Sequence, residues 1–282
     1  MRTLITCPGI GDFIFLAEKL SGVSEQFKVV MSDSLPQRGH QLMELLPDLI
    51  GAHEYRPGLT YKKVNDNNIT RRKGRREWRS ITEQEFYLSA NEHLEQGRRI
   101  EQFLPDLPTS FRLDYATDED NKDIAMALLP SGPYIGIYTS AYSNARNWNG
   151  WGPKEWFEMV ELLQPTGATI VIIGAAYDVG VVEDLTKDMD QEKIKYINTT
   201  GQPLGVVVEI LKRLNYFIGF PSGLSILNET LGKDGVMFYP PHLQKMINTW
   251  ADPERIASGA YKGCLFCEPE KIFDWMKNEY KI

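Results

Sequence analysis

The sequence is poor in cysteine and histidine, the residues that most often crosslink small domains or bind metals. It has three cysteines, Cys7, Cys264 and Cys267, an odd and sparse set that excludes a disulfide framework and is typical of a reducing cytosol. Cys264 and Cys267 have CxxC spacing, but a zinc site needs a complete tetrahedral ligand set and no second pair exists. The four histidines show no ligand spacing. We therefore expect a cytoplasmic protein without a metal.

Long apolar runs and an excess of positive charge are also missing. No apolar stretch approaches the roughly 20 residues of a membrane span. The first residues contain no apolar run followed by a small-residue cleavage site, so we expect no signal peptide. The formal net charge of −7 argues against a protein that coats nucleic acid with its whole surface. Hydrophobic residues make up 42% of the chain, which is enough to form real cores. We also expect a monomer.

Short apolar strands alternate with amphipathic helices along the chain. We expect strands at 2–6, 27–31, 134–138, 169–173, 216–219 and 236–239, and helices at 12–20, 37–46, 83–104, 153–163, 204–214, 223–231 and 269–280. This alternation predicts parallel sheets with crossover helices. We therefore predict an α/β fold of two Rossmann-like domains facing a cleft, 1–115 and 116–282. The last helix is a candidate to pack back on the first domain.

The first candidate site is the turn Gly9-Ile10-Gly11-Asp12, between the first expected strand and the first expected helix. Glycines at such a turn let the backbone approach a ligand closely. An acid at a helix N-terminus stays ionised because the helix dipole favours negative charge, so Asp12 could act as a catalytic base. A helix-capping role explains the same residue at least as simply, and the pattern alone leaves both interpretations open.

Two loops in the second half have the features of a phosphate site. Tyr138-Thr139-Ser140 and Arg146-Asn147-Trp148 follow an expected strand, and hydroxyls near an arginine suit a phosphate group. Ser222-Gly223-Leu224 begins an expected helix, whose first N–H groups can bind an anion. A solvated loop with a structural tryptophan, and an ordinary N-cap at Ser222 or Ser225, are the simpler alternatives.

One segment departs from the acidic balance of the chain. Residues 70–79 hold six basic residues against one acid. Five of these cations form what we call the basic segment: Arg71, Arg72, Lys73, Arg75 and Arg76. A solvated loop would explain them. Contact with a polyanionic acceptor would also explain them. That acceptor would be a phosphorylated glycan core or DNA with hydroxymethylated bases, as some phages make, and the DNA would need its target base flipped out towards Asp12.

Taken in order, these motifs resemble the ADP-heptose:lipopolysaccharide heptosyltransferase family, glycosyltransferase family 9. The resemblance covers most of 1–46 and 134–242. Five features carry it: Gly11-Asp12; Tyr138-Thr139-Ser140 with Arg146, Trp148 and Pro153; the turn from Gly174 to Asp178; the helix start at 221–227; and the turn at 238–241. Two residues depart from the family pattern, because Pro221 stands where the family has Asp and Ile226 where it has His.

The resemblance implies the GT-B architecture and an inverting, metal-independent transfer of a sugar from a nucleotide-diphosphate donor to a hydroxyl. Asp12 would be the base, with Gly11 and the basic segment on the acceptor side. The implied donor residues are Thr139, Ser140, Arg146, Asp178, Ser222, Gly223 and Leu224. Two alternatives stay open. The departures at 221 and 226 favour a non-catalytic nucleotide-sugar-binding protein, against which the intact Gly11-Asp12 turn counts. The lack of well-placed histidines counts against a nucleotide-sugar epimerase.

Overall fold

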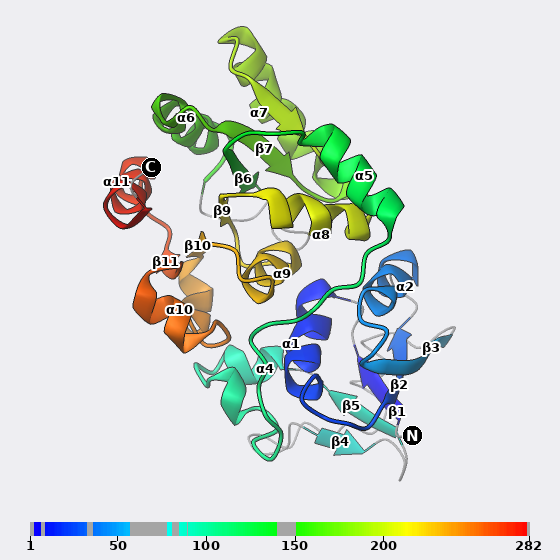
Figure 1. Cartoon of the computed structure of the whole chain (residues 1–282). Coiled ribbons are helices and arrows are strands. Elements are labelled where there is room, and N and C mark those ends of the chain that lie inside the picture. Colours follow the sequence, from blue (N-terminus) through cyan, green and yellow to red (C-terminus); the bar gives the residue numbers. More distant parts are fainter. Residues whose placement is uncertain are drawn as a thin grey trace. The chain divides into compact units, whose positions relative to one another are not determined.

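The computed structural model describes residues 3–6, 9–32, 36–56, 78–80, 85–88, 90–139 and 151–280. The chain forms two compact units, Met1–Ala116 and Thr117–Ile282, and each unit has its own sheet covered by helices (Figure 1). The expected α/β class with parallel sheets is therefore confirmed. None of the helices in the described ranges is long and apolar enough to cross a membrane.

The first unit has a five-stranded sheet in the order β3-β2-β1-β5-β4. Its elements are β1 (Thr3–Thr6), α1 (Ile10–Leu20), β2 (Phe27–Ser32), α2 (Pro36–Glu44), β3 (Ile50–Arg56), β4 (Trp78–Ser80), β5 (Glu85–Leu88), α4 (Asn91–Leu94) and the 3-10 turn η1 (Ile100–Gln102). β1 lies between β2 and β5 and runs parallel to both, whereas β4 is antiparallel to β5. Phe13, Leu16 and Leu20 of α1 are buried, as their helical spacing requires.

The helix expected over 83–104 is wrong. This stretch instead contains β5, one turn of α4 and the turn η1. β5 pairs with β1, so that Thr3 lies opposite Glu85 and Ile5 opposite Tyr87. This tertiary pairing overrides a weak helical pattern, and aromatic residues favour strands. Gly97 then adopts φ 80°, the left-handed conformation that glycine takes without strain, soon after α4 ends.

The second unit has a six-stranded sheet in which all strands are parallel, in the order β11-β10-β9-β6-β7-β8. The strands are β6 (Tyr134–Tyr138), β7 (Thr169–Ile173), β8 (Tyr196–Asn198), β9 (Tyr216–Gly219), β10 (Gly235–Tyr239) and β11 (Tyr261–Leu265). Renumbered from one, they stand in the order 3-2-1-4-5-6, which is that of the Rossmann fold. The strand order therefore reverses between β6 and β9, the place where such sheets bind ligands.

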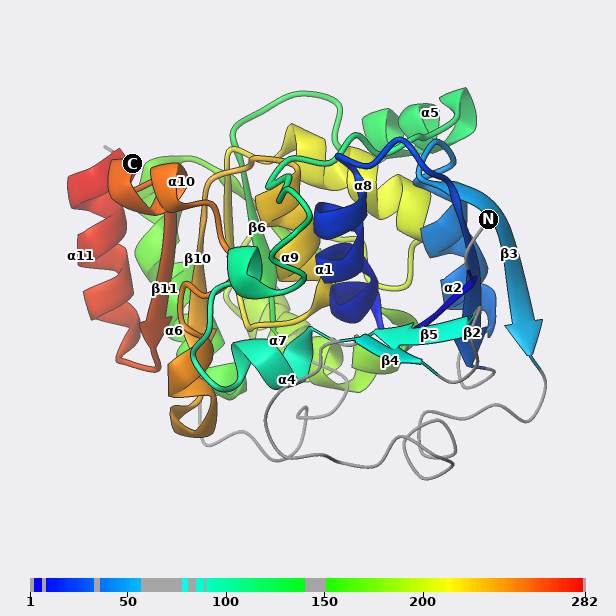
Figure 2. The same cartoon turned by 90° about the horizontal axis from the view of Figure 1, so that it is seen from below.

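Helices cover both faces of this sheet (Figure 2). They are α5 (Glu119–Leu128), α6 (Pro153–Leu163), α7 (Val179–Gln191), α8 (Leu204–Arg213), α9 (Gly223–Thr230), α10 (Pro253–Ser258) and α11 (Pro269–Tyr280), with 3-10 turns η2 (Gln164–Thr166), η3 (Ala176–Asp178) and η4 (Pro241–Met246). α6 packs against both α7 and α11, and α8 packs against both α5 and α9. Trp156 of α6 and Met276 of α11 join one core cluster with the sheet residues Ile137, Ile172 and Ile218.

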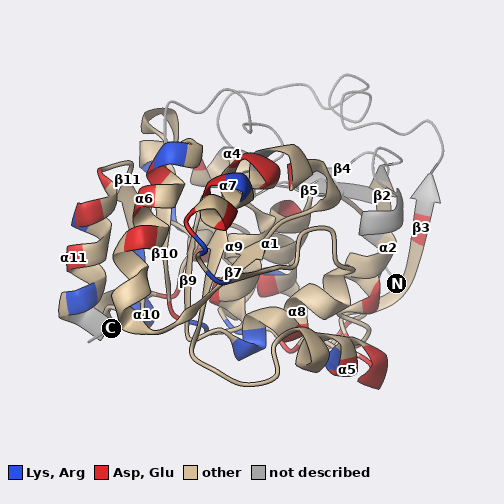
Figure 3. Ribbon diagram, turned by 90° about the horizontal axis from the view of Figure 1, so that it is seen from above, with Lys and Arg blue, Asp and Glu red and all other residues tan. Residues whose placement is uncertain are grey.

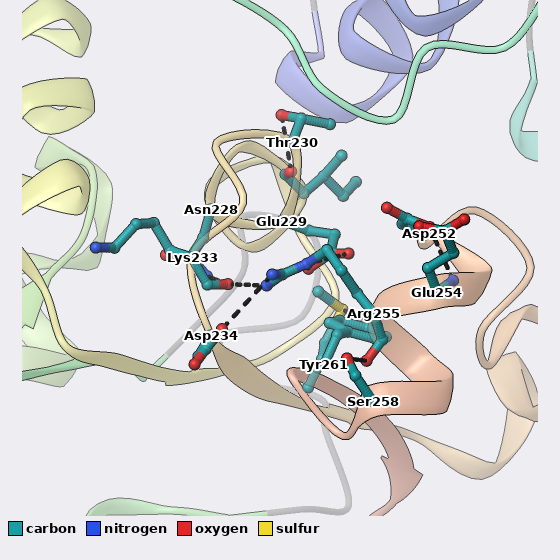
Figure 4. Close-up of polar contacts among 12 residues, drawn as sticks. Asn228, Glu229, Thr230, Lys233, Asp234, Asp252, Glu254, Arg255, Ser258 and Tyr261 are labelled. Carbon is teal, nitrogen blue, oxygen red and sulfur yellow. Dashed lines mark hydrogen bonds and ion pairs between the residues drawn. The ribbon is translucent and has the colours of Figure 1, made fainter. Parts of the chain in front are cut away.

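A buried ion pair joins the end of α9 to α10 (Figure 4). Arg255 Nε donates to both carboxylate oxygens of Glu229 at 3.1 Å, and its side chain is 9% exposed against 3% for Glu229. The same guanidinium donates to the Lys233 carbonyl at 2.6 Å and lies 3.5 Å from an Asp234 carboxylate oxygen. Each charge is thus compensated, which a buried ion requires. The network fixes one end of α9, whose other end belongs to the candidate site.

Candidate functional site

In the second unit, the ends of neighbouring strands bring polar residues to one edge of the sheet. The register sets Tyr138 opposite Ile173 and Gly219, and Ile172 opposite Asn198. Continued past the strands, it places Thr139 beside Gly174, and Gly174 beside Thr200. This edge is the carboxyl end of the parallel strands and includes the point where the strand order reverses. Ligands of Rossmann-like sheets bind in this position.

Thr139 is buried there with an unused hydroxyl. The residue is 3% exposed, and its Oγ1 makes no hydrogen bond with any residue that the structure describes. The buried Oγ1 of Thr200 also lacks a hydrogen-bond partner among the described residues. A buried hydroxyl without a partner costs roughly 1–3 kcal/mol. A ligand that accepted a hydrogen bond would remove that cost.

The start of α9 lies at the same edge, because β9 is the neighbour of β6. Ser222 occupies the N-cap position, but its side chain makes no capping hydrogen bond. Ser225 Oγ donates back to the Phe220 carbonyl at 2.5 Å. Ser222 is therefore the N-cap residue, as the simpler alternative expected, but its side chain does not cap the helix. The first-turn N–H groups, including those of Gly223 and Leu224, have no partner within the helix and can bind an anion.

Tyr138 and Asp178 lie beneath this edge. Burial, and then the charge of Asp178, raise the pKa of Tyr138 well above its ordinary value, so its hydroxyl stays protonated. The nearby Ser222 hydroxyl acts in the opposite direction and lowers the pKa of Tyr138. Its geometry is nevertheless too poor for a hydrogen bond with any described residue. Asp178 is 1% exposed, and its Oδ2 accepts the Ala175 N–H at 2.7 Å. A Cβ at Gly174 would lie 3.1 Å from that Oδ2, so a larger residue there would have to displace the carboxylate slightly.

Asp12 lies at the corresponding position in the first unit, just after β1. Helix α1 begins at Ile10 with Gly9 as its N-cap. Asp12 is therefore the third helical residue, with Gly11 before it, and Gly9 rather than Asp12 occupies the N-cap position. Its half-buried carboxylate accepts a hydrogen bond at Oδ1 from Asn91 Nδ2 at 2.5 Å. Acid in the first turn is stabilised by the helix dipole.

Sequence reasoning missed Asn91 because β5, the strand before it, was assigned to a helix. Thr200 was missed because it follows β8, a strand of only three residues. Ser140, Arg146 and the basic segment lie outside the described residues. Among the described helices, acidic residues are prominent on α5 and α7 (Figure 3), in keeping with the net charge.

The CxxC pair has structural surroundings. Cys264 and Cys267 are half-buried and pack against the core cluster of the second unit. Trp151 Nε1 donates to the Cys267 carbonyl at 2.7 Å, which ties the segment before α6 to the segment after β11. Within the described ranges, no group of three or more His, Cys, Asp or Glu residues is arranged to hold a metal ion.

Several solved structures with the same fold are glycosyltransferases, and one is a UDP-GlcNAc 2-epimerase. ADP-heptose lps heptosyltransferase II of E. coli is 12% identical, with a TM-score of 0.62 over 99% of this chain and 98% of that one. The glycosyl transferase family 9 protein of Veillonella parvula is 15% identical, with a TM-score of 0.57 over 85% and 82%. The E. coli heptosyltransferase WaaC with ADP is 14% identical, with a TM-score of 0.53 over 100% and 98%. At these identities the likeness shows the fold, which is the GT-B fold of these enzymes.

The sequence itself matches a family model. Glycosyltransferase family 9 (heptosyltransferase) matches residues 69–271, a span that contains Thr139, Asp178 and Ser222 and begins after Asp12. No curated protein matches the sequence. The family match covers most of the chain and includes the second-unit edge with its unused hydroxyls. The protein therefore belongs to glycosyltransferase family 9 and is a nucleotide-sugar glycosyltransferase.

Proposed function

We propose that the protein transfers a sugar from a nucleoside-diphosphate donor to a hydroxyl of a polyanionic acceptor, with inversion and without a metal. The observation that carries the donor half is the buried Thr139 hydroxyl, which lacks a partner among the described residues. A diphosphate at this edge would give a partner both to that hydroxyl and to the first-turn N–H groups of α9. Ser140 and Arg146, in the segment that follows Thr139, would add polar and charge-assisted contacts.

Asp12 is the proposed base. The acceptor oxygen forms a bond to the anomeric carbon while the bond from that carbon to the diphosphate oxygen breaks. The acceptor proton passes to the Asp12 carboxylate, and the bonding electron pair leaves with the nucleoside diphosphate. Hydrogen-bond donors at the second-unit edge stabilise the charge that develops on the leaving group. This stabilisation is usually the largest contribution to such catalysis. Attack opposite the leaving group inverts the anomeric centre.

Ile226 stands where the family has a histidine, and this changes which groups can hold phosphate. It stands in the first turns of α9, is 6% exposed, and its N–H donates to the Ser222 carbonyl at 3.0 Å. Its side chain cannot donate to an oxygen, so diphosphate binding would rest on hydroxyls and backbone N–H groups. One structure with this fold contains ADP and another is described as an ADP-heptose enzyme. Adenosine diphosphate is therefore the first nucleotide to test.

The basic segment supplies the acceptor half of the proposal. Its cations suit an acceptor rich in phosphate, and the first domain is where we propose that the acceptor binds. A phosphorylated lipopolysaccharide core and DNA with hydroxymethylated bases both have the required hydroxyl and negative charge. Turnover should be measured with each, because a transfer to DNA would lose affinity steeply as salt rises. The cytoplasm, where the reduced cysteines would persist, is the proposed location.

The test of the proposal has two stages. ADP-, GDP- and UDP-sugars are first screened by thermal shift, since a ligand at 100 times its dissociation constant stabilises by about 2.7 kcal/mol. Release of nucleoside diphosphate is then measured with each acceptor for wild type and Asp12→Asn. We expect the turnover of Asp12→Asn to fall about 10²–10⁴-fold with donor affinity unchanged. EDTA should leave turnover unaltered.

Glu155→Gln is the matched control. Glu155 is also the third residue of its helix, α6, and its Oε2 accepts the Gly152 N–H at 2.7 Å. Neutralising it should lower the melting temperature through loss of the capping and dipole contributions, while turnover stays at the wild-type rate. Turnover of Asp12→Asn close to that of wild type would remove Asp12 from the mechanism.

A further inference from the structure

We infer that Asn91 is a positioning residue for the Asp12 carboxylate. This inference rests on the proposed function, in which Asp12 is the base. Asn91 Nδ2 donates to Asp12 Oδ1 at 2.5 Å across 79 residues of sequence. A hydrogen bond to an ionised acceptor is among the stronger ones in proteins. Asn91 is therefore in a position to fix how the carboxylate presents its oxygens to an acceptor hydroxyl.

The topology of the first sheet brings the two residues together. β1 and β5 are adjacent and parallel, with Leu4 opposite Phe86 and Ile5 opposite Tyr87. β2 and β3 lie on the other side of β1, so the strand order reverses between β1 and β5. Asp12 follows β1 and Asn91 follows β5. The pair therefore lies at the carboxyl ends of two strands that flank a switch point, where open α/β sheets bind ligands.

Asn91 stands on a firmly anchored turn. Ala90 and Leu94, at either end of α4, are 2% and 0% exposed. His93, 1% exposed, has its Nε2 2.8 Å from the Arg99 carbonyl, within hydrogen-bond distance. A group that orients a reacting side chain must itself be held by packing and hydrogen bonds. The burial of the residues around Asn91 supplies that support.

Among the described residues, the Asn91 amide makes its hydrogen bond to Asp12. The N-cap residue of α4 is Ala90, which has no side-chain cap. The bond to Asp12 instead joins two elements remote in sequence. Without it, the Asp12 carboxylate would lose one of the contacts that orient it and would spend less time in the productive orientation. The loss should appear in kcat rather than in donor affinity, because the amide acts only on the reacting group.

The experiment is a double-mutant cycle on turnover. Asn91→Ala, Asn91→Asp, Asp12→Asn and the double variant Asp12→Asn/Asn91→Ala are compared with wild type, using the best donor and acceptor from the screen described above. Asn91→Ala should lower kcat on the order of tenfold, the typical effect of losing a hydrogen bond to a charged group. The dissociation constant for the free nucleoside diphosphate should not change. In the Asp12→Asn background, Asn91→Ala should have little further effect, because Asn91 acts through Asp12.

Asn91→Asp separates positioning from structure. It keeps the shape of the side chain and suits the first turn of a helix, so a structural role predicts that it is milder than Asn91→Ala. A positioning role predicts the reverse order, because a second carboxylate removes the donor and repels Asp12. Asn215→Ala is the matched control, since Asn215 Oδ1 accepts the Tyr134 N–H at 2.9 Å in the other unit. It should affect the melting temperature and leave kcat unchanged.

The outcomes distinguish the inference from the function on which it rests. If Asp12→Asn turns over like wild type, the proposed base is wrong. If Asp12→Asn is slow and Asn91→Ala is fast, the base stands and the positioning role is overturned. The role is also overturned if Asn91→Ala slows wild type and Asp12→Asn by equal factors, or if Asn91→Asp is faster than Asn91→Ala. A tenfold loss confined to the wild-type background, with Asn91→Asp slower still, supports it.

Discussion

Thr139→Val is the substitution that most directly tests the donor edge. Valine has nearly the volume of threonine and replaces the hydroxyl by a methyl group, so the core around β6 keeps its packing. Thr139 is 3% exposed and its Oγ1 has no partner among the described residues. For an ordinary buried threonine the change removes a hydrogen bond. Here it removes a buried hydroxyl that no described residue satisfies.

Thr139→Val should therefore preserve or raise the stability of the free protein and weaken nucleotide binding. Without ligand, the free energy of unfolding of Thr139→Val should stay level or rise by up to about 2 kcal/mol, because an unpaired buried hydroxyl is costly. With a nucleoside diphosphate, a hydrogen bond to a charged group is lost, which is worth roughly 1.5–3 kcal/mol. At about 1.4 kcal/mol per factor of ten, the dissociation constant should rise by about one to two orders of magnitude.

Thr230→Val supplies the matched control. Thr230 is 1% exposed and lies at the far end of α9, where its hydroxyl donates to the carbonyls of Ile226 and Leu227 at 3.2 Å. The same chemical change should cost about 1 kcal/mol of stability there. Nucleotide affinity should not move. The assay is ADP titration by calorimetry, with urea unfolding of both variants and wild type in the absence of nucleotide.

The refuting pattern is specific. If Thr139→Val is destabilised as much as Thr230→Val and binds ADP and every nucleotide sugar of the screen like wild type, the Thr139 hydroxyl serves the fold. The second-unit edge would then lose the observation on which the donor site rests. A gain in stability together with weaker binding has no simple explanation other than a hydroxyl that the ligand satisfies.

Two further predictions concern other parts of the chain. Arg255→Met should cost about 3–5 kcal/mol in urea unfolding, because it leaves the carboxylate of Glu229 buried and uncompensated; Glu229→Gln together with Arg255→Met should recover much of this loss, and a single-variant cost below about 1 kcal/mol would contradict the reasoning. Neutralising the basic segment as a set should raise the acceptor KM and leave the donor dissociation constant unchanged. Unchanged turnover at limiting acceptor would assign the segment to a solvated loop.

The sequence was most informative where strands are buried on both faces. The expected strands at 134–138, 169–173 and 216–219 coincide with β6, β7 and β9, because their burial leaves a continuous apolar run. β8 and β11 form the two edges of the sheet and are partly exposed. Their sequences lack such a run, and neither strand was predicted. Exposure at an edge removes the pattern on which prediction depends.

Hydrogen-bond pairing was harder to predict from the sequence than secondary structure. Thr139 and Ser222 were found as candidates from their place after strands. That both hydroxyls are buried, and that Thr139 Oγ1 has no partner among the described residues, depends on distant residues that no local pattern contains. The role of Asn91 was not predicted for a related reason, because it requires β5 to pair with β1. The segment 85–88 resembles a helix when its partner strand is ignored. Long-range pairing determined what local propensity could not.

Two candidate residues of the donor edge depart from a local rule. Thr139 is a buried hydroxyl without a partner among the described residues, and Ser222 is an N-cap residue whose side chain does not cap. Both lie at the carboxyl ends of parallel strands, where ligands bind in such sheets. A polar group buried without a partner lowers stability unless a ligand completes its hydrogen bonding. At this edge we therefore expect bound substrate, rather than the fold, to supply the missing partner.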